Sequence, residues 1–308
     1  MSFQNLVLRA VLKITQRLSM RLSAKHRFRR NRKFLSADRS KVGSKLLVQA
    51  GQLGGVPVEW VRPKRLADHP HTPICLYFHG GAFVMGSLNS HRDMAAYLAE
   101  KAGITLLMVD YRLAPEHPFP AALDDAMAVY RALIAQGVPS QRLLMAGDSA
   151  GGNITLACLQ AVRDERLALP AAFFLFSPWL DLKHDSPSHS VNASTDVMLN
   201  TQLLDEAVAM YAPGVPREDA RLSPLHGHVG GLPPCLLIAS SSEILRDDAL
   251  RLQLKIQAEG GSVDYVEWKN TPHAFPVLAR FLPEARSALD ETARFIGQFT
   301  HHPLGDPD

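Results

Sequence analysis

Two patterns of hydrophobic and polar positions alternate along most of the chain. From about residue 45 onward, short β-branched or apolar runs alternate with segments in which apolar residues recur every three or four positions. The short runs predict eight strands, at residues 45–49, 56–61, 73–79, 104–110, 142–148, 171–177, 234–240 and 262–268. The longer segments predict helices near residues 88–102, 119–136, 150–166, 246–259 and 284–299.

The central runs are almost entirely apolar, which is typical of strands buried on both faces. Strands that alternate with amphipathic helices indicate an α/β protein built on a mostly parallel sheet. The sequence therefore predicts an eight-stranded, mostly parallel sheet with helices on both faces.

One segment interrupts this alternation. About fifty residues between 182 and 232 contain no clear strand and only one good helical pattern, at 201–211. A long insertion in a regular sheet is more often functional than incidental. We expect residues 184–225 to form a cap insertion that divides a core made of 46–183 and 226–308.

The first residues of the chain have a different character. Apolar residues recur at helical spacing on one side, and basic residues recur on another: Val7, Val11, Ile14, Leu18 and Leu22, against Arg9, Lys13, Arg17 and Arg21. Residues 1–43 hold 12 Lys or Arg and one acid, a net +11, whereas the remainder holds 21 basic and 29 acidic residues, a net −8. The pattern predicts an amphipathic helix followed by a basic stretch, and we assign residues 1–45 to an N-terminal helical cap segment.

Several roles are open for this segment. Its apolar face could pack on the body of the protein as a lid over the active site, or the helix could lie on an anionic membrane surface. A disordered tail is a third interpretation. Nucleic-acid binding is disfavoured because no aromatic residues interleave the charges, and Arg9 and Lys13 interrupt any secretory signal.

Composition indicates what kind of protein this is and where it is found. No apolar run approaches the roughly 20 residues that a membrane-spanning helix needs. Cys75, Cys158 and Cys235 each lie in an apolar stretch, with neither metal-binding spacing nor a disulfide framework. We expect buried free thiols, a cytoplasmic protein and no metal.

The strongest chemical signal is the pentapeptide GDSAG around Ser149. It follows a predicted strand directly and precedes a predicted helix. In a nucleophile elbow this sharp turn exposes the serine hydroxyl, and only very small residues fit two positions away on either side. We expect Ser149 to be a nucleophile and the N–H of Ala150 to face the developing oxyanion.

A second signal is HGGAF, which begins at His79 and ends another predicted strand. Gly80, Gly81 and Ala82 offer backbone N–H groups that could stabilise a tetrahedral intermediate. Adjacent glycines after a strand could also form an ordinary turn, and the serine motif at the correct distance favours the hydrolase interpretation.

A serine nucleophile needs a base and an acid that orients it. His273 follows the last predicted strand in a loop, whereas His301 and His302 belong to a polar tail. Glu243 directly follows the strand at 234–240. Asp247 is the second candidate for the acid, although Asp247 and Asp248 read as first-turn residues of the next helix.

Taken in order, HGGAF, DYRLAPEHPFPAALDD, GDSAGGN, SPWLDL, the E-x-L-x-D motif at 243–247 and PHAF resemble the hormone-sensitive-lipase (HSL) family of bacterial esterases over residues 73–280. The resemblance implies an α/β-hydrolase fold with a helical cap. It also implies cofactor-free hydrolysis of short- to medium-chain acyl esters, with Ser149, Glu243 and His273 as the triad.

This sequence departs from the family pattern at two points. Glu243 stands where the acid motif usually has Asp, and Ala82 stands where HGGG has its third glycine. Ala82 still has its N–H, so the resemblance implies an oxyanion hole made by Gly81, Ala82 and Ala150, with Gly80 shaping the turn. Arg112 and Glu116 look like a structural ion pair of the family, and Asp148 also looks structural.

We therefore predict a carboxylesterase that acts on a small ester without a nucleic-acid partner. Two alternatives stay open: an amide or lactone hydrolase with the same triad, and a non-catalytic receptor of this fold, as in gibberellin receptors that have lost the base. Membrane contact through the N-terminal helix and a homodimer are further interactions that the sequence leaves open.

Overall fold

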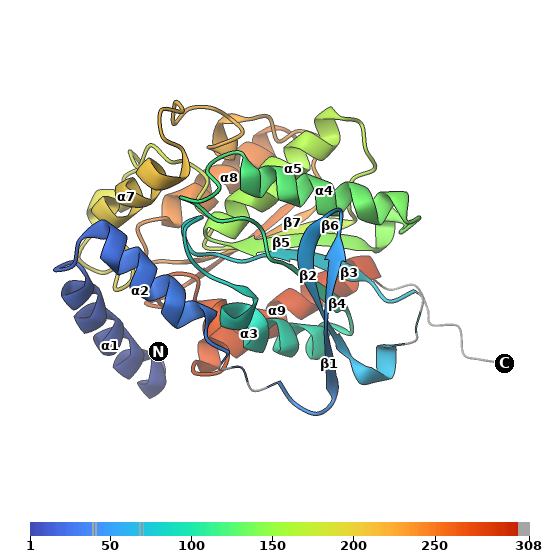
Figure 1. Cartoon of the computed structure of the whole chain (residues 1–308), viewed down its shortest axis with the longest axis horizontal. Coiled ribbons are helices and arrows are strands. Elements are labelled where there is room, and N and C mark those ends of the chain that lie inside the picture. Colours follow the sequence, from blue (N-terminus) through green and yellow to red (C-terminus); the bar gives the residue numbers. More distant parts are fainter. Residues whose placement is uncertain (39, 41, 68, 70, 301–308) are drawn as a thin grey trace.

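The computed structural model describes residues 1–300 except 39, 41, 68 and 70, and shows one eight-stranded sheet (Figure 1). The strands are β1 (Leu46–Leu53), β2 (Val56–Pro63), β3 (Ile74–Phe78), β4 (Thr105–Val109), β5 (Leu143–Asp148), β6 (Ala172–Phe176), β7 (Cys235–Ser240) and β8 (Val263–Trp268). Their order across the sheet is β1-β2-β4-β3-β5-β6-β7-β8. Only the β1–β2 and β2–β4 pairs are antiparallel, and the other five are parallel.

Helices cover both faces of the sheet. The α-helices of the described chain are α1 (Phe3–Ser19), α2 (Ala24–Ser36), α3 (Leu88–Ala102), α4 (Ala121–Ala135), α5 (Ala150–Asp164), α6 (Ser188–Val191), α7 (Thr201–Tyr211), α8 (Arg246–Ala258) and α9 (Pro283–Thr300). In Figure 1, α4, α5 and α8 lie on one side of the sheet, whereas α3 and α9 lie on the other. Two hydrophobic cores follow, one on each face.

The alternating side chains of the strands explain these two cores. In β3, Leu76 and Phe78 join the core beneath α4 and α5, whereas Cys75 and Tyr77 join the core beneath α3 and α9. A strand buried on both faces must be apolar throughout, and four of the five β3 residues are fully buried.

The predicted fold class is confirmed, and every predicted strand and helix of the core corresponds to an observed one within a few residues. The helix expected at 201–211 is α7. The buried thiols expected at Cys75, Cys158 and Cys235 are also observed. His301 and His302 lie outside the described residues.

The N-terminal segment contains a second helix that the sequence analysis missed. Residues predicted as a basic stretch form α2, whose Phe28 is buried and whose Arg27 is almost fully buried. The Arg27 guanidinium forms an ion pair with Glu206 of α7. This pair joins the N-terminal segment to the insertion, and in Figure 1 α1, α2 and α7 lie at the same end of the molecule.

The expectation that α1 packs through its apolar face is wrong. Val7, Val11, Ile14 and Leu18 are each 45–60% exposed. The opposite face docks instead, with Asn5 and Ser19 buried and Leu8 against the α3–α9 core. The reason is that side chains on this polar face form hydrogen bonds with the rest of the protein, and these bonds determine which face of α1 is buried. The periodicity of the sequence alone does not reveal such bonds.

Candidate active site

The turn between β5 and α5 holds Ser149 in an uncommon backbone conformation. Its φ is 52° and its ψ is −119°, a region that costs free energy for a residue with a side chain. The turn is held from two sides: Ser149 N–H donates to the Phe176 carbonyl (3.0 Å), and Trp179 N–H donates to the Ser149 carbonyl (3.1 Å). This is the geometry that the nucleophile-elbow motif predicts.

The glycines around Ser149 are required by close backbone contacts. A Cβ on Gly151 would lie 1.9 Å from the Phe78 carbonyl oxygen, and one on Gly147 would lie 2.3 Å from Gly151. Such distances leave no room for a side chain. The two glycines therefore allow α5 to begin directly against the end of β3.

The HGGA segment follows β3 and lies beside this turn. Gly80 N–H donates to Asp148 Oδ1 (2.9 Å), so this donor holds the loop in place. Gly81 adopts a φ of 127°, and Ala82 follows with a φ of 54°. The N–H of Ala150 belongs to the first turn of α5, where backbone donors have no partner within the helix.

Asp148 is the centre of a buried network beneath the loop. Its Oδ1 also accepts a hydrogen bond from the Tyr77 hydroxyl (2.9 Å) and lies 3.1 Å from His91 Nε2. Burial raises the pKa of Asp148, but the charge and hydrogen bonds of His91 and the other donors outweigh it and lower the pKa overall. Asp148 therefore remains an anion that fixes the Gly80 amide.

Glu243 and His273 are brought together from two loops. His273 Nδ1 lies 2.5 Å from Glu243 Oε2, and both side chains are buried. Glu243 follows β7 and His273 follows β8, and adjacent parallel strands end at the same edge of the sheet. The arrangement leaves Nε2 as the imidazole nitrogen available to a nucleophile.

Ser177 connects these loops, and the sequence analysis gave it no role. Its hydroxyl donates to Glu243 Oε1 (2.8 Å) and accepts from the Ala274 N–H (3.0 Å). The same segment binds Ser149 N–H through the neighbouring Phe176 carbonyl. The end of β6 therefore anchors both the serine turn and the histidine loop.

Two residues of the insertion form hydrogen bonds with the loop that carries Glu243. Asn192 Nδ2 donates to the Glu243 carbonyl (2.8 Å), and Asp196 Oδ2 accepts from Ile244 N–H (2.9 Å). Asp196 is buried, and its burial raises its pKa. No sequence motif marked Asn192 or Asp196, because their function depends on which loop the insertion covers.

The electrostatics of the site favour a protonated histidine at mildly acid pH. Burial lowers the pKa of His273, but the hydrogen bond and charge of Glu243, with a further contribution from Asp196, outweigh burial. The net result is a pKa of His273 above its ordinary value of 6.5. A base of this kind is neutral, and able to accept a proton, only above that shifted pKa.

The remaining candidates occupy structural positions. Asp247 Oδ2 accepts from Ser188 N–H (2.8 Å), away from the His273 hydrogen bond. The expected Arg112–Glu116 ion pair is wrong. Arg112 binds Asp125, and Glu116 binds Arg32 of α2. The sequence proximity of Arg112 and Glu116 was misleading, because α4 supplies the acidic partner of Arg112 and α2 supplies the basic partner of Glu116.

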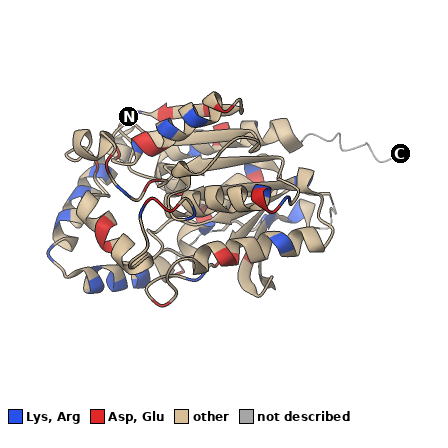
Figure 2. Cartoon of the chain, turned by 90° about the horizontal axis from the view of Figure 1, so that it is seen from above, with Lys and Arg blue, Asp and Glu red and all other residues tan. Residues whose placement is uncertain are grey.

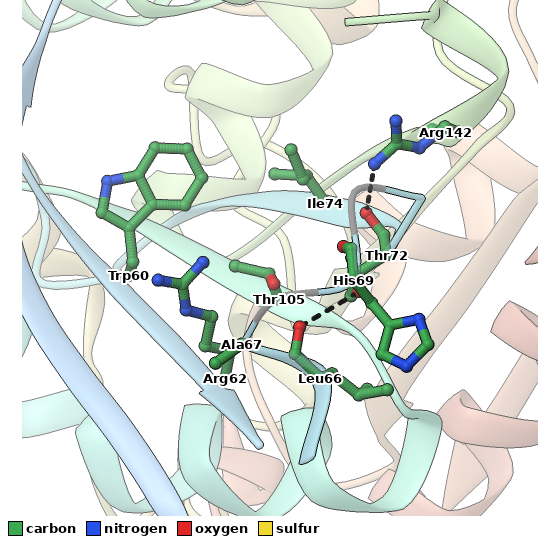
Figure 3. Close-up of a pocket in the computed structure, with 9 residues that line it drawn as sticks. All are labelled: Trp60, Arg62, Leu66, Ala67, His69, Thr72, Ile74, Thr105 and Arg142. Carbon is green, nitrogen blue, oxygen red and sulfur yellow. Dashed lines mark hydrogen bonds between the residues drawn. The ribbon is translucent and has the colours of Figure 1, made fainter. Parts of the chain in front are cut away.

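Two cavities open at the other edge of the sheet. The smaller, of about 270 Å³, is lined by residues at the starts of β3 and β4 and by neighbouring side chains, among them Trp60 and His69 (Figure 3). Arg142 at its rim donates to the Thr72 carbonyl (2.8 Å). A second cavity, of about 1160 Å³, shares part of this lining. Glu243 and His273 follow the opposite ends of their strands, so neither cavity adjoins these candidate residues.

Within the described residues, no group of His, Cys, Asp or Glu side chains is arranged to hold a metal ion. None of the helices described is both long and apolar enough to span a bilayer.

Comparison with known proteins identifies the family. Residues 75–277 match a protein family described as the alpha/beta hydrolase fold. The chain belongs to the α/β-hydrolase family. Within it, this hydrolase is 32% identical to an esterase of the bacterial HSL family of known crystal structure, with a TM-score of 0.89 over 98% of this chain and 99% of that one.

Two curated relatives agree with that assignment. The hydrolase is 39% identical to an acetyl-hydrolase of Streptomyces hygroscopicus over 79% of this chain and 80% of the relative. It is 35% identical to an esterase of Acinetobacter venetianus over 78% and 82% of the two chains. The HSL-family resemblance predicted from the motifs is confirmed.

Proposed function

We propose that this protein is a carboxylesterase whose nucleophile is Ser149, whose base is His273 and whose orienting acid is Glu243. The observation that supports it best is the hydrogen bond between Glu243 and His273. Ser149 is held on a strained turn, and the end of β6 hydrogen-bonds both this turn and the histidine loop. The relatives named esterase and acetyl-hydrolase support ester hydrolysis as the reaction.

In the proposed reaction, Ser149 Oγ attacks the ester carbonyl while His273 Nε2 takes the hydroxyl proton. Glu243 accepts the Nδ1–H hydrogen bond and stabilises the imidazolium. The N–H groups of Gly81, Ala82 and Ala150 stabilise the oxyanion, and Gly80 supports the loop from below. His273 then gives its proton to the departing alcohol.

Water completes the cycle by attacking the acyl-enzyme, with His273 again acting as base. The second tetrahedral intermediate expels Ser149, which recovers its proton from the imidazolium. These steps need only the side chains and amides named, so the proposal involves no cofactor.

The substrates proposed are short- to medium-chain acyl esters. We assign the N-terminal segment (1–45) and the insertion (184–225) to a cap over the core formed by 46–183 and 226–308. The contacts between α2 and α7, and between the insertion and the Glu243 loop, support this division.

Ser149→Ala tests the proposal directly. Because the nucleophile is lost, hydrolysis of butyrate and octanoate esters should fall by about 10⁵-fold. A fluorophosphonate probe should label the wild-type protein on the peptide that contains Ser149 and should not label the variant. Ester hydrolysis that persists in Ser149→Ala, or labelling at another residue, contradicts the assignment.

A further inference from the structure

The outer side of α1 carries an uncovered hydrophobic surface. Seven of the eleven large hydrophobic residues that are exposed in the described chain belong to residues 1–18. Six of them form what we call the apolar ridge: Phe3, Leu6, Val7, Val11, Ile14 and Leu18. Their side chains are 45–77% exposed, so this helix leaves a continuous apolar stripe without cover from the rest of the described chain.

The inner side of α1 is held by directional contacts. Asn5 Nδ2 donates to the Asn270 carbonyl (3.2 Å), and Gln16 Nε2 donates to the Leu199 carbonyl (2.8 Å). Arg9 Nη2 donates to the Thr195 carbonyl (2.9 Å). Turning the ridge inward would break these hydrogen bonds, so the outward orientation is the stable one for the folded protein.

The charge around the ridge indicates what it binds. Residues 1–37 contain no Asp or Glu. Arg17 and Arg21 are exposed near the ridge, and α2 adds the exposed Arg29, Arg30 and Lys33. Figure 2 shows Lys and Arg gathered at the end of the molecule where Figure 1 places α1 and α2. A basic, amphipathic helix of this kind suits an anionic lipid surface, where acyl chains accept the apolar side chains and phosphates accept the charges.

A second copy of the chain fits this surface less well. A symmetric dimer places the same patch of each subunit face to face. Two segments that each carry a net +11 over residues 1–43 would then meet, and like charges repel.

We infer that α1 docks this hydrolase on anionic lipid surfaces and so brings its catalytic end to esters held in that surface. The link to catalysis is structural: Arg9 Nη1 donates to Ser242 Oγ (3.0 Å) and to the Thr271 carbonyl (3.3 Å). These residues lie beside Glu243 and His273, so a helix seated on lipid holds both catalytic loops close to it. The catalytic part of this inference rests on the proposed esterase function, whereas the binding part does not.

The test uses the full chain and vesicles of phosphatidylcholine with or without phosphatidylglycerol. In a sedimentation assay, the wild-type protein should bind the anionic vesicles and bind pure phosphatidylcholine at least about tenfold more weakly, because the basic residues contribute. The triple variant Val7→Gln, Val11→Gln, Ile14→Gln should lose about tenfold or more in affinity, because the ridge no longer inserts.

Leu254→Gln is the matched control. Leu254 is 57% exposed on α8, so the variant removes an exposed apolar side chain of a helix outside the ridge. It should bind vesicles as the wild type does. Both variants should hydrolyse dissolved p-nitrophenyl butyrate within about twofold of the wild-type rate, because the substituted side chains are exposed and the hydrogen bonds from α1 to the Glu243 and His273 loops come from Arg9.

Three results would overturn the inference. One is a wild-type protein that does not sediment with anionic vesicles, and another is a ridge variant that binds as tightly as the wild type. The third is a wild-type dimer that the ridge substitutions convert to monomers without any vesicle binding, which would make a second copy the occupant. The double variant Arg17→Gln, Arg21→Gln tests the contribution of the basic residues separately from that of the ridge. Vesicle binding does not depend on catalysis, so it can be measured even if Ser149 proves not to be the nucleophile.

Discussion

At the scale of single residues, both oxygens of the Glu243 carboxylate have hydrogen-bond partners. One oxygen faces His273, and the other accepts from Ser177 Oγ and from Ser240 N–H (2.7 Å). A carboxylate held by several hydrogen bonds keeps its orientation. The extra methylene of Glu relative to Asp is therefore accommodated without leaving an oxygen unpartnered.

The raised pKa of His273 predicts how activity depends on pH. Burial lowers this pKa, but the hydrogen bond and the charge of Glu243 raise it by more, so the pKa of His273 lies above its ordinary value of 6.5. Since the base must be neutral, kcat/KM should fall as the pH drops through the raised value. Glu243→Gln removes the charge, so the acid limb should move to lower pH while kcat falls by about 10⁴-fold.

Asp247→Ala is the control for that experiment. It removes a carboxylate in the first turn of α8 that binds Ser188 N–H, so the variant should keep the wild-type acid limb and most of the turnover. A pH–rate profile for both variants checks this. An acid limb that moves in Asp247→Ala and stays in Glu243→Gln would make Asp247 the orienting acid.

Ser177 should act as a positioning residue. Ser177→Ala leaves the Ala274 N–H without its buried acceptor and removes one donor to Glu243, so unfolding free energy should fall by about 1–3 kcal/mol. We also expect kcat to fall with little change in KM, since the histidine loop loses an anchor.

Ser223→Ala is a matched substitution at a serine whose hydroxyl hydrogen-bonds none of the proposed triad residues. Ser223 is equally buried, and its hydroxyl accepts from Leu182 N–H (2.9 Å). It should lose similar stability in a denaturant titration and keep its kcat. Equal losses of kcat in the two variants would refute the positioning role of Ser177.

At the scale of elements, the position of the serine turn depends on how closely α5 approaches β3. Gly151 has no left-handed backbone conformation to maintain, so its role is purely to leave space next to the Phe78 carbonyl. This contact sets where α5 begins, and the start of α5 sets the position of Ser149 and of the Ala150 N–H.

Gly151→Ala should therefore be severely destabilising. The added methyl would lie 1.9 Å from a backbone oxygen, which cannot move aside without displacing β3. We expect a loss of roughly 4 kcal/mol or more in unfolding free energy, at the upper end of what single substitutions cause. Thermal unfolding of the purified variant measures it.

Gly103→Ala separates space from conformation. Gly103 ends α3 with a φ of 65°, and a Cβ there would meet nothing within 4 Å. Its cost should be only about 1–2 kcal/mol, the strain of a left-handed residue with a side chain. If Gly151→Ala proved as mild as Gly103→Ala, the close approach of α5 to β3 would not be what sets the serine turn.

At the scale of the whole molecule, two segments far apart in the sequence meet over the catalytic loops. The insertion contacts the Glu243 loop through Asn192 and Asp196, and α1 contacts both catalytic loops through Arg9. The catalytic geometry is therefore supported by residues outside the core sheet.

Arg9→Met should show this support. The substitution keeps much of the aliphatic side chain but removes the hydrogen bonds to Ser242, Thr271 and Thr195. We expect a several-fold drop in kcat on a dissolved ester and faster proteolysis within residues 1–22. Arg17→Met, which changes an exposed arginine of the same helix, should leave both measurements unchanged; identical behaviour of the two variants would argue against the support.

The sequence by itself determined the features that depend on local pattern. Short apolar runs located the strands of the core, because a strand buried on both faces must be apolar throughout. Helical periodicity located the helices, because each buries one face. The glycines around Ser149 located the serine turn for a similar reason, since only residues without a side chain fit it. Chain order then selected Glu243 and His273 as candidates.

Tertiary structure decided which surfaces meet. It turned the polar face of α1 inward, folded the basic stretch into α2, and gave Ser177 and Asp196 their partners. An amphipathic pattern reports only that two faces differ, and a buried serine or aspartate is specified by groups distant in the chain. Those partners become neighbours only when the sheet and its insertion have folded, so their contacts leave no local signal.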